Sequence, residues 1–193
     1  MDPEKKKGRN VMKEFNADKS VIIPEGVFII GTYDENGVPN AMNAAWCMQS
    51  DTAELSISLG THKTTDNFMK TGAFTVAFAT VKTLVISDYF GVESGRNVNK
   101  IEKAGVHVHK SAYVNAPVIE EYPLTLECRV KSFEDGILVG EIVHVSADDS
   151  ILTDGKVDLG KMELICFDEY AGVYRRVGEV VGRAFHDGLA LRK

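Results

Sequence analysis

Alternation of apolar and polar positions is the strongest pattern in this chain, and it predicts strands. Residues 54–59 (ELSISL) place an apolar side chain at every second position, which is typical of a half-buried strand. Residues 26–34 (GVFIIGTYD) and 73–80 (AFTVAFAT) are rich in β-branched and aromatic residues and are also predicted as strands. Residues 161–169 (KMELICFDE) predict a last long strand.

The longest predicted element is a hairpin over residues 123–148. Its first arm places four apolar side chains on one face: Leu124, Leu126, Cys128 and Val130. The EDG sequence at 134–136 predicts the turn, after which ILVGEIVHV returns as the second arm. A second reversal is predicted at 34–37 (DENG), ahead of VPNAMN.

Helical patterns are short and local. We predict helices at 64–72, 82–91 and 97–105, each ending at a glycine, followed by a mostly irregular C-terminal sequence. Because strands occur in runs with only short helices between them, a parallel sheet of βαβ units is disfavoured. A closed or nearly closed antiparallel barrel fits better, since closure removes unpaired sheet edges.

Length and composition indicate one globular domain. The 193 residues are 44% hydrophobic and 26% charged, a balance that is typical of soluble proteins. We assign residues 21–170 to the domain, 1–20 to a flexible N-terminal tail and 171–193 to a C-terminal extension. The net charge of −6 argues against nucleic-acid binding, which requires clustered Lys and Arg.

The cysteines and the N-terminus predict a cytoplasmic protein. Cys47, Cys128 and Cys166 are widely spaced and form no CxxC pair, as expected in a reducing compartment. The basic N-terminus lacks the apolar stretch of a signal peptide. No run of about 18 apolar residues predicts a membrane span.

The segment 40–50 (NAMNAAWCMQS) reads poorly as a strand, because it mixes small residues, asparagines and the only tryptophan. One interpretation is a wall for a planar cofactor ring, which needs amide donors and side chains small enough for close approach. The alternative is an edge strand in which Trp46 anchors the core while Met42 and Met48 fill gaps, and for Trp46 we expect this core role. Cys47 has no second cysteine nearby to support a redox role.

Two further segments are candidate anion sites. Residues 58–67 (SLGTHKTTDN) run from a strand into a helix start, where free N–H groups, hydroxyls and nearby cations attract phosphate. Residues 94–100 (SGRNVNK) bring Arg96 and Lys100 within reach of one anion. Each segment alone also fits a plainer interpretation, namely an ordinary helix N-cap and a basic surface loop.

Other polar residues predict structural roles. His107 and His109 have a spacing that could hold a metal, but without an identifiable Asp, Glu or Cys partner we predict no metal site. We expect His144 to be a strand histidine with a satisfied hydrogen bond. We expect Glu127 to form a structural ion pair rather than to take part in acid–base catalysis.

Taken in order, these segments resemble the flavin reductase-like family, in its flavoredoxin and ferric-reductase branch. The resemblance rests on GTYDENGVPNAMNAAW, LSISLGTHKTTDNFMKTGAFTVAFAT, SGRNVNKIEKAG, and APVIEEYPLTLECRV with LVGEIVHV, within residues 22–168. It implies a mainly β fold, an antiparallel split β-barrel of Greek-key type with a few short helices, which binds FMN. It also implies a homodimer with FMN near the subunit interface, where the C-terminal extension is a candidate contact.

The resemblance also implies which residues contact FMN. The segment matching 40–48 lies along the isoalloxazine ring and ribityl chain, that matching 58–67 holds ribityl and phosphate, and that matching 94–100 closes over the cofactor. The residues carried over are Asn40, Met42, Asn43, Ala44, Ala45, Trp46, Cys47, Ser58, His62, Lys63, Thr64, Thr65, Asn67, Ser94, Arg96 and Lys100. The chain departs from the family at Ala45, where a hydroxyl residue often precedes the tryptophan, and near His62, where Ser or Arg is common.

The implied function is that of an FMN-binding oxidoreductase, which passes electrons from NADH or NADPH through FMN to a flavin, a ferric chelate or a protein. The flavin carries the chemistry, so no protein acid or base is expected as a catalytic residue. Two alternatives remain open. One is an electron carrier or FMN store without turnover, and the other is a pyridoxamine-phosphate oxidase-like enzyme, which needs further Arg and His contacts to its substrate.

Overall fold

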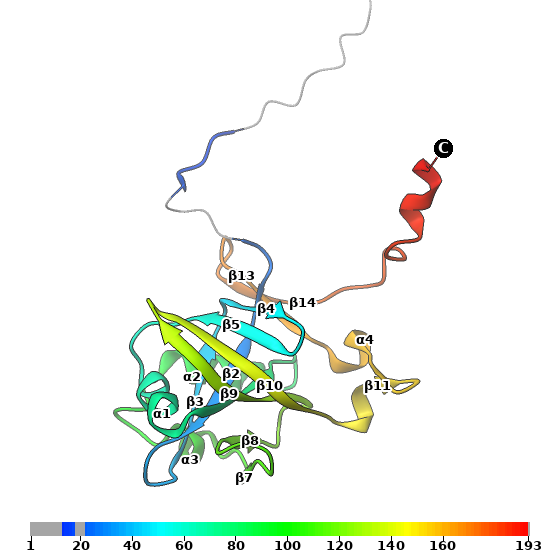
Figure 1. Ribbon diagram of the computed structural model, residues 1–193. Coiled ribbons are helices and arrows are strands. Elements are labelled where there is room, and N and C mark those ends of the chain that lie inside the picture. The colour runs from blue at the N-terminus through cyan, green and yellow to red at the C-terminus, as the bar shows by residue number, and fades with distance from the viewer. Residues whose placement is uncertain (1–12, 18–21, 193) are drawn as a thin grey trace, which may run out of the picture.

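A curled seven-stranded antiparallel sheet forms the centre of the molecule (Figure 1). The structure is a computed structural model and describes residues 13–17 and 22–192. The sheet has the order β3-β2-β6-β9-β10-β5-β4. Its strands are β2 (Phe28–Tyr33), β3 (Pro39–Ala44), β4 (Cys47–Asp51), β5 (Glu54–Ser58), β6 (Ala73–Phe78), β9 (Leu124–Glu134) and β10 (Ile137–Ala147).

The two edges of this sheet are consecutive in sequence. Strands β3 and β4 lie at opposite ends of the strand order, yet only Ala45 and Trp46 separate them. A link of two residues spans only about 10 Å, so the sheet must curl until its edges nearly meet. The barrel is therefore split at Ala45 and Trp46.

Smaller sheets surround the barrel. Strands β1 (Glu25–Gly26), β13 (Ile165–Asp168) and β14 (Val173–Arg176) form one of them, β7 (Val108–Lys110) pairs with β8 (Pro117–Ile119), and β11 (Leu152–Thr153) pairs with β12 (Lys156–Val157). All strand pairs among the described residues are antiparallel. The predicted antiparallel architecture is thus confirmed.

The predicted long hairpin is also confirmed. Strands β9 and β10 pair along their length, and Asp135 and Gly136 form the turn with positive φ values of 50° and 79°. Two adjacent residues in the left-handed region give the turn a twist that matches the flanking strands. The predicted reversal at 34–37 joins β2 to β3, where the Asp34 carboxylate accepts hydrogen bonds from the amides of Asn36 and Val38.

The helices lie close to their predicted positions. They are α1 (Lys63–Thr71), α2 (Leu84–Val92), α3 (Lys100–Ala104) and α4 (Leu159–Met162), with short 3-10 turns at Asp149–Ile151 and Asp187–Leu191. Gly72 and Gly105 end α1 and α3 in the left-handed conformation, as predicted. Helix α2 instead continues through Gly91 and ends at Val92, which corrects the predicted end.

Two strand predictions need correction. The segment 40–50, which reads poorly as a strand, holds most of β3 and β4. Both are edge strands, which need only one pairing partner and therefore tolerate small and polar side chains. The segment 161–169 is only partly a strand, since residues up to Met162 belong to α4. Asp158 caps that helix by accepting hydrogen bonds from the amides of Gly160 and Lys161.

Strand β2 separates two hydrophobic cores. Ile30 faces the barrel interior, where side chains converge from β5, β6, β9 and β10 and where Phe68 of α1 closes one end. Ile29 faces outward and packs with Phe90 of α2 and Ile101 of α3. Burial on both faces explains why β2 is a nearly continuous apolar run. It also fixes α2 and α3 against the outside of β2 and β3.

After β14 the chain leaves the barrel as an arm (Figure 1). The Val177 amide donates a hydrogen bond to the Leu164 carbonyl at 2.8 Å. Beyond it, Val180, Val181 and Phe185 are fully or almost fully exposed. None of the helices within residues 13–17 and 22–192 is long and apolar enough to cross a membrane.

Replacing Gly140 by alanine is expected to destabilise the barrel. A Cβ atom at this position would overlap the Phe74 ring, which is fully buried in the interior core. Overpacking of this kind costs about 1–3 kcal/mol. Urea unfolding should show this loss for Gly140→Ala, whereas Gly60→Ala, whose Cβ makes only an ordinary contact with His62, should unfold like the wild type. Equal midpoints would contradict the packing argument.

Candidate functional site

Two adjoining hollows lie where the barrel splits, with volumes of about 290 and 220 Å³. They share Met42, Asn43 and His62. The larger hollow, called here the polar end, lies between β3, the start of α1 and the loop after α2. The smaller one, called the ring end, lies against Ala44–Trp46 and the end of β5. Together they form a concave path with a polar and a less polar end.

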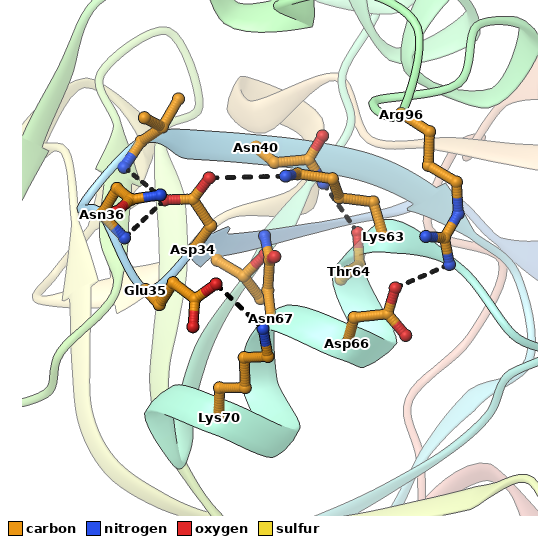
Figure 2. A network of polar contacts seen from close by, with 12 residues as sticks. Asp34, Glu35, Asn36, Asn40, Lys63, Thr64, Asp66, Asn67, Lys70 and Arg96 are labelled. Carbon is orange, nitrogen blue, oxygen red and sulfur yellow. Dashed lines mark hydrogen bonds and ion pairs between the residues drawn. The ribbon is translucent and has the colours of Figure 1, made fainter.

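Asn40 of β3 ties three elements together at the polar end. Its side-chain amide donates a hydrogen bond to the Thr64 hydroxyl at the start of α1, at 2.9 Å (Figure 2). Because the Thr64 oxygen accepts this bond, its own proton is left for another acceptor. Gly95 brings the loop after α2 against Asn40 so closely that a Cβ at position 95 would overlap the Asn40 Oδ1 atom.

The start of α1 is held in place by Thr65. Its hydroxyl donates to the Gly60 carbonyl at 2.8 Å and accepts from the His62 amide at 3.3 Å. Helix α1 has nine residues, and the N–H groups of its first turn carry a partial positive charge toward the polar end. Lys63 and Thr64, both in this turn, line that hollow.

Two of the cations at the polar end are paired with carboxylates. Arg96 contacts Asp66 at 2.6 Å and so links the loop after α2 to α1, as Figure 2 shows. Lys63 contacts Asp34 at 3.4 Å, which ties α1 to the turn between β2 and β3. Such partly exposed pairs contribute little to stability, but they hold the rim of the hollow in position.

Lys100 differs from these cations because it is buried and lines the hollow. Only 3% of its surface is exposed, and its Nζ donates to the Phe90 carbonyl at 2.9 Å. It forms no ion pair with any residue that the structure describes. Desolvation lowers the pKa of Lys100 to about 8, although the negative charge of Glu93 acts in the opposite direction. An anion in the hollow would supply the direct ion-pair partner that Lys100 lacks among the described residues.

Trp46 lies at the surface of the ring end, and the core role expected for it is wrong. Its side chain is 63% exposed, while its indole N–H donates to the carboxylate of Glu25 at 2.9 Å. The link between two sheet edges points its side chain away from the interior core. An apolar groove of about 560 Å³ continues from the ring end and shares Ala45, Trp46 and Ser58 with it.

The structure brings most of the predicted site residues together. Asn40, Met42, Asn43, His62, Lys63, Thr64, Ser94, Arg96 and Lys100 line the polar end, and Ala44, Ala45, Trp46 and Ser58 line the ring end. Thr65, Asn67 and Cys47 line neither hollow. Thr65 holds the helix start, Asn67 donates to the Thr32 hydroxyl at 3.0 Å, and Cys47 lies along the apolar groove.

Sequence reasoning missed several lining residues at the end of α2. Phe90, Gly91, Val92 and Glu93 contribute to the polar end. The amide of Asn43 in β3 donates to the Ser87 carbonyl at 3.0 Å, which fixes α2 over this strand. The glycine at 91 was visible as a helix-end signal, but the packing of this helix over β3 depends on tertiary contacts that no local pattern contains.

Three residues that sequence analysis considered for chemistry have surroundings that indicate structural roles: Cys47, His144 and Glu127. Burial raises the pKa of the Cys47 thiol to about 12, which keeps it protonated near neutral pH. His144 Nδ1 contacts the buried Glu127 carboxylate at 2.7 Å, and the other Glu127 oxygen accepts from the Ser111 hydroxyl. The expected satisfied histidine is thus confirmed, and the polar contacts of Glu127 are with His144 and Ser111.

His107 and His109 contact different carboxylates. His107 Nδ1 lies 2.9 Å from Glu121, and His109 Nδ1 lies 3.1 Å from Glu120. Each histidine therefore has an acidic partner that could not be identified from the sequence. Among the described residues, however, the structure contains no group of three or more His, Cys, Asp or Glu that could hold a metal ion.

Comparison with known proteins identifies the family. The model of the flavin reductase like domain matches residues 20–161. The flavoredoxin of Desulfovibrio vulgaris (Miyazaki F) is 30% identical, with a TM-score of 0.87 over 92% of this chain and 100% of that chain. The flavoredoxin from Methanosarcina acetivorans is 28% identical, with a TM-score of 0.86 over 94% and 100%.

A more distant likeness supports the fold. An FMN-binding domain of a flavin reductases-like enzyme from Shewanella baltica OS155 is 20% identical, with a TM-score of 0.74 over 82% of this chain and 88% of that chain. At 20% identity this likeness shows the architecture alone. The predicted split-barrel fold is confirmed.

The buried Lys100 should make stability rise with pH. The pKa of Lys100 is about 8 in the native chain, against 10.5 for an unperturbed lysine. Between these two pH values the unfolded chain binds more protons than the native chain, so raising the pH favours the native state. Wild type should gain on the order of 1–3 kcal/mol of unfolding free energy relative to Lys100→Met between pH 7 and 9.5. Urea unfolding of both proteins measures this. A difference that does not change with pH would contradict the assigned burial.

Proposed function

Since the chain belongs to the flavin reductase like domain family, we propose that it is an FMN-binding oxidoreductase. In this proposal electrons pass from NADH or NADPH through bound FMN to a flavin, a ferric chelate or a protein. One observation carries the proposal: a continuous concave path joins a buried lysine, which has no ion pair among the described residues, to a ring-sized hollow with small side chains at the other end. FMN has the same polarity, a phosphate at one end and a flat ring at the other.

The polar end fits a phosphate. Lys100 provides a cation without a carboxylate partner among the described residues, Thr64 provides a hydroxyl proton, and the first turn of α1 provides N–H groups. Gly95 lets the loop after α2 approach Asn40, and the contact of Arg96 with Asp66 holds that loop over the site. These residues therefore bind and enclose the anionic group.

The ring end fits the isoalloxazine. Ala44 and Ala45 leave the backbone accessible at the split, and Trp46 stands at the rim with its N–H bound to Glu25. When bound, the flavin supplies hydride acceptance and electron transfer. The protein's own residues orient the ring and leave one side open to a second reactant, so a protein acid or base is not required.

Two further properties belong to the proposal. The family resemblance supports a homodimer with FMN near the subunit interface. The three free thiols, Cys47, Cys128 and Cys166, support a reducing, cytoplasmic setting.

Anaerobic titration with NADH and NADPH tests the proposed reaction. The protein should perturb the visible absorbance of added FMN, and one of the nucleotides should bleach it faster than it bleaches free FMN. Bound FMN that is bleached by dithionite but by neither nucleotide would contradict the reductase and favour an electron carrier. FMN that is fully recovered on desalting with an unperturbed spectrum would contradict the cofactor assignment itself.

Lys100→Met is expected to weaken FMN binding but to leave riboflavin binding unchanged. A hydrogen bond to a charged group contributes about 1.5–3 kcal/mol, so the FMN dissociation constant should rise roughly 10- to 100-fold. Lys103→Met, on the exposed side of the same helix, is the matched control. Fluorescence titration of wild type and both variants with each ligand measures all six dissociation constants.

The pH dependence of binding gives an independent check. Loss of the Lys100 proton above about pH 8 should weaken FMN binding by the wild type and leave riboflavin binding unchanged. Equal losses of both ligands in Lys100→Met would argue against a phosphate contact.

A further inference from the structure

The hydroxyl group of Tyr174 contacts helix α2 beside the flavin site. Tyr174 lies in β14, outside residues 20–161, which the family model matches. Its hydroxyl donates a hydrogen bond to the Asp88 carboxylate at 2.8 Å. Asp88 directly follows Ser87 in the chain, and the Ser87 carbonyl accepts a hydrogen bond from the Asn43 amide at 3.0 Å. The tyrosine and the asparagine therefore meet at the same turn of α2.

The Asn43 amide also acts on the Tyr174 hydroxyl. Desolvation and the Asp88 carboxylate raise the pKa of Tyr174 to about 12, while the Asn43 side chain lowers this pKa through a hydrogen bond. Only a donor to the phenol oxygen has that effect, so the bonds run in one direction, from the Asn43 N–H through the Tyr174 O–H to the Asp88 carboxylate. Hydrogen bonds in such a chain polarise and strengthen one another.

The tyrosine ring is itself held in place. Tyr174 pairs with Phe167 across β13 and β14, and the two ring centroids lie 5.7 Å apart. Both rings pack against the outer core, which contains Ile29 and Phe90. The hydroxyl therefore projects from a packed strand, as is required of a group that orients another side chain.

Asn43 lies in the middle of the concave path, because it lines both the polar end and the ring end. A carboxamide has two N–H donors and one carbonyl acceptor. Ser87 and Tyr174 engage the N–H groups of Asn43, so its carbonyl oxygen is the polar atom left for a ligand. An acceptor at this point favours a ligand that has a hydroxyl donor between its ring and its anionic group. In FMN the ribityl chain occupies this place.

We propose that Tyr174 and Asp88 are positioning residues of the cofactor site, which hold the Asn43 carbonyl oxygen toward the path so that it accepts a hydrogen bond from a hydroxyl of the ribityl chain. This inference rests on the proposed binding of FMN and adds two residues that line neither hollow. They act on the flavin only through Asn43.

Tyr174→Phe removes the hydroxyl and keeps the ring. Its dissociation constants for FMN and for riboflavin should both rise roughly 2- to 10-fold, which is the effect of one hydrogen bond between neutral groups. Lumiflavin, which has the ring but no ribityl chain, should bind as it binds to wild type. The loss in Lys100→Met, by contrast, should be restricted to FMN. Fluorescence titration measures these constants.

Tyr113→Phe is the matched control for this variant. It removes the same hydroxyl from a ring that is stacked on His144, and Tyr113 lines neither hollow. All three ligands should bind to it as they bind to wild type.

A double-mutant cycle decides whether Tyr174 acts through Asn43. Asn43→Ala should weaken the binding of FMN and riboflavin, and adding Tyr174→Phe should cause no further loss, because the contact that the tyrosine orients is already absent. Asp88→Ala should reproduce the loss of riboflavin binding, whereas Asp88→Asn keeps an acceptor for the Tyr174 hydroxyl and should bind riboflavin like wild type. Riboflavin is the probe for the Asp88 variants because it has no phosphate on which the lost charge would act.

The outcomes separate this inference from the proposed function. Additive losses in the double mutant, an equal loss of lumiflavin binding, or unchanged riboflavin binding by Tyr174→Phe would overturn the positioning role. If Tyr174→Phe does not fold, as urea unfolding would show, Asp88→Ala and Asp88→Asn give the same test. A wild type that binds neither FMN nor riboflavin would overturn the cofactor assignment and this inference with it. Bound FMN that neither nucleotide reduces would count against the reductase alone.

Discussion

The two-residue link between β3 and β4 is the constraint on which the rest of the molecule depends. Strands at opposite edges of a seven-stranded sheet are joined by Ala45 and Trp46 alone. Because this link is short, the sheet must curl until its two edges lie close together. Among the described residues, β3 and β4 each pair with one strand of this sheet only, so their outer edges border the split. The candidate site lies at this gap, because a hollow with accessible backbone is what an incomplete closure leaves behind.

Packing on both faces of β2 turns this gap into a site with two distinct ends. The interior core positions α1, while the outer core positions α2 and α3 against β3. The start of α1 and the end of α2 thereby meet above the split. Paired cations hold the rim, and Lys100 of α3 remains buried without an ion pair among the described residues.

Local patterns were sufficient for the antiparallel class, the long hairpin and both glycine-capped helices, while most of the lining residues came from the family resemblance. They failed where the outcome depends on partners distant in sequence. Trp46 looks like a core residue, and only the position of its strand link shows that it faces outward. The start of 161–169 reads as a strand, but Asp158 caps a helix there. The role of Gly91 depends on packing against Asn43, which lies on another element.

The contact between Asn40 and Gly95 links two positions that are far apart in the chain. The volume that a side chain at 95 would need is already occupied by the Asn40 amide, which in turn holds Thr64. The side chain of Asn40 and any side chain at position 95 would therefore occupy the same volume. Over evolutionary time a larger residue at 95 can be accepted only together with a smaller one at 40, which would also release the start of α1. Among relatives, the residues at positions 40 and 95 should therefore change together or remain unchanged.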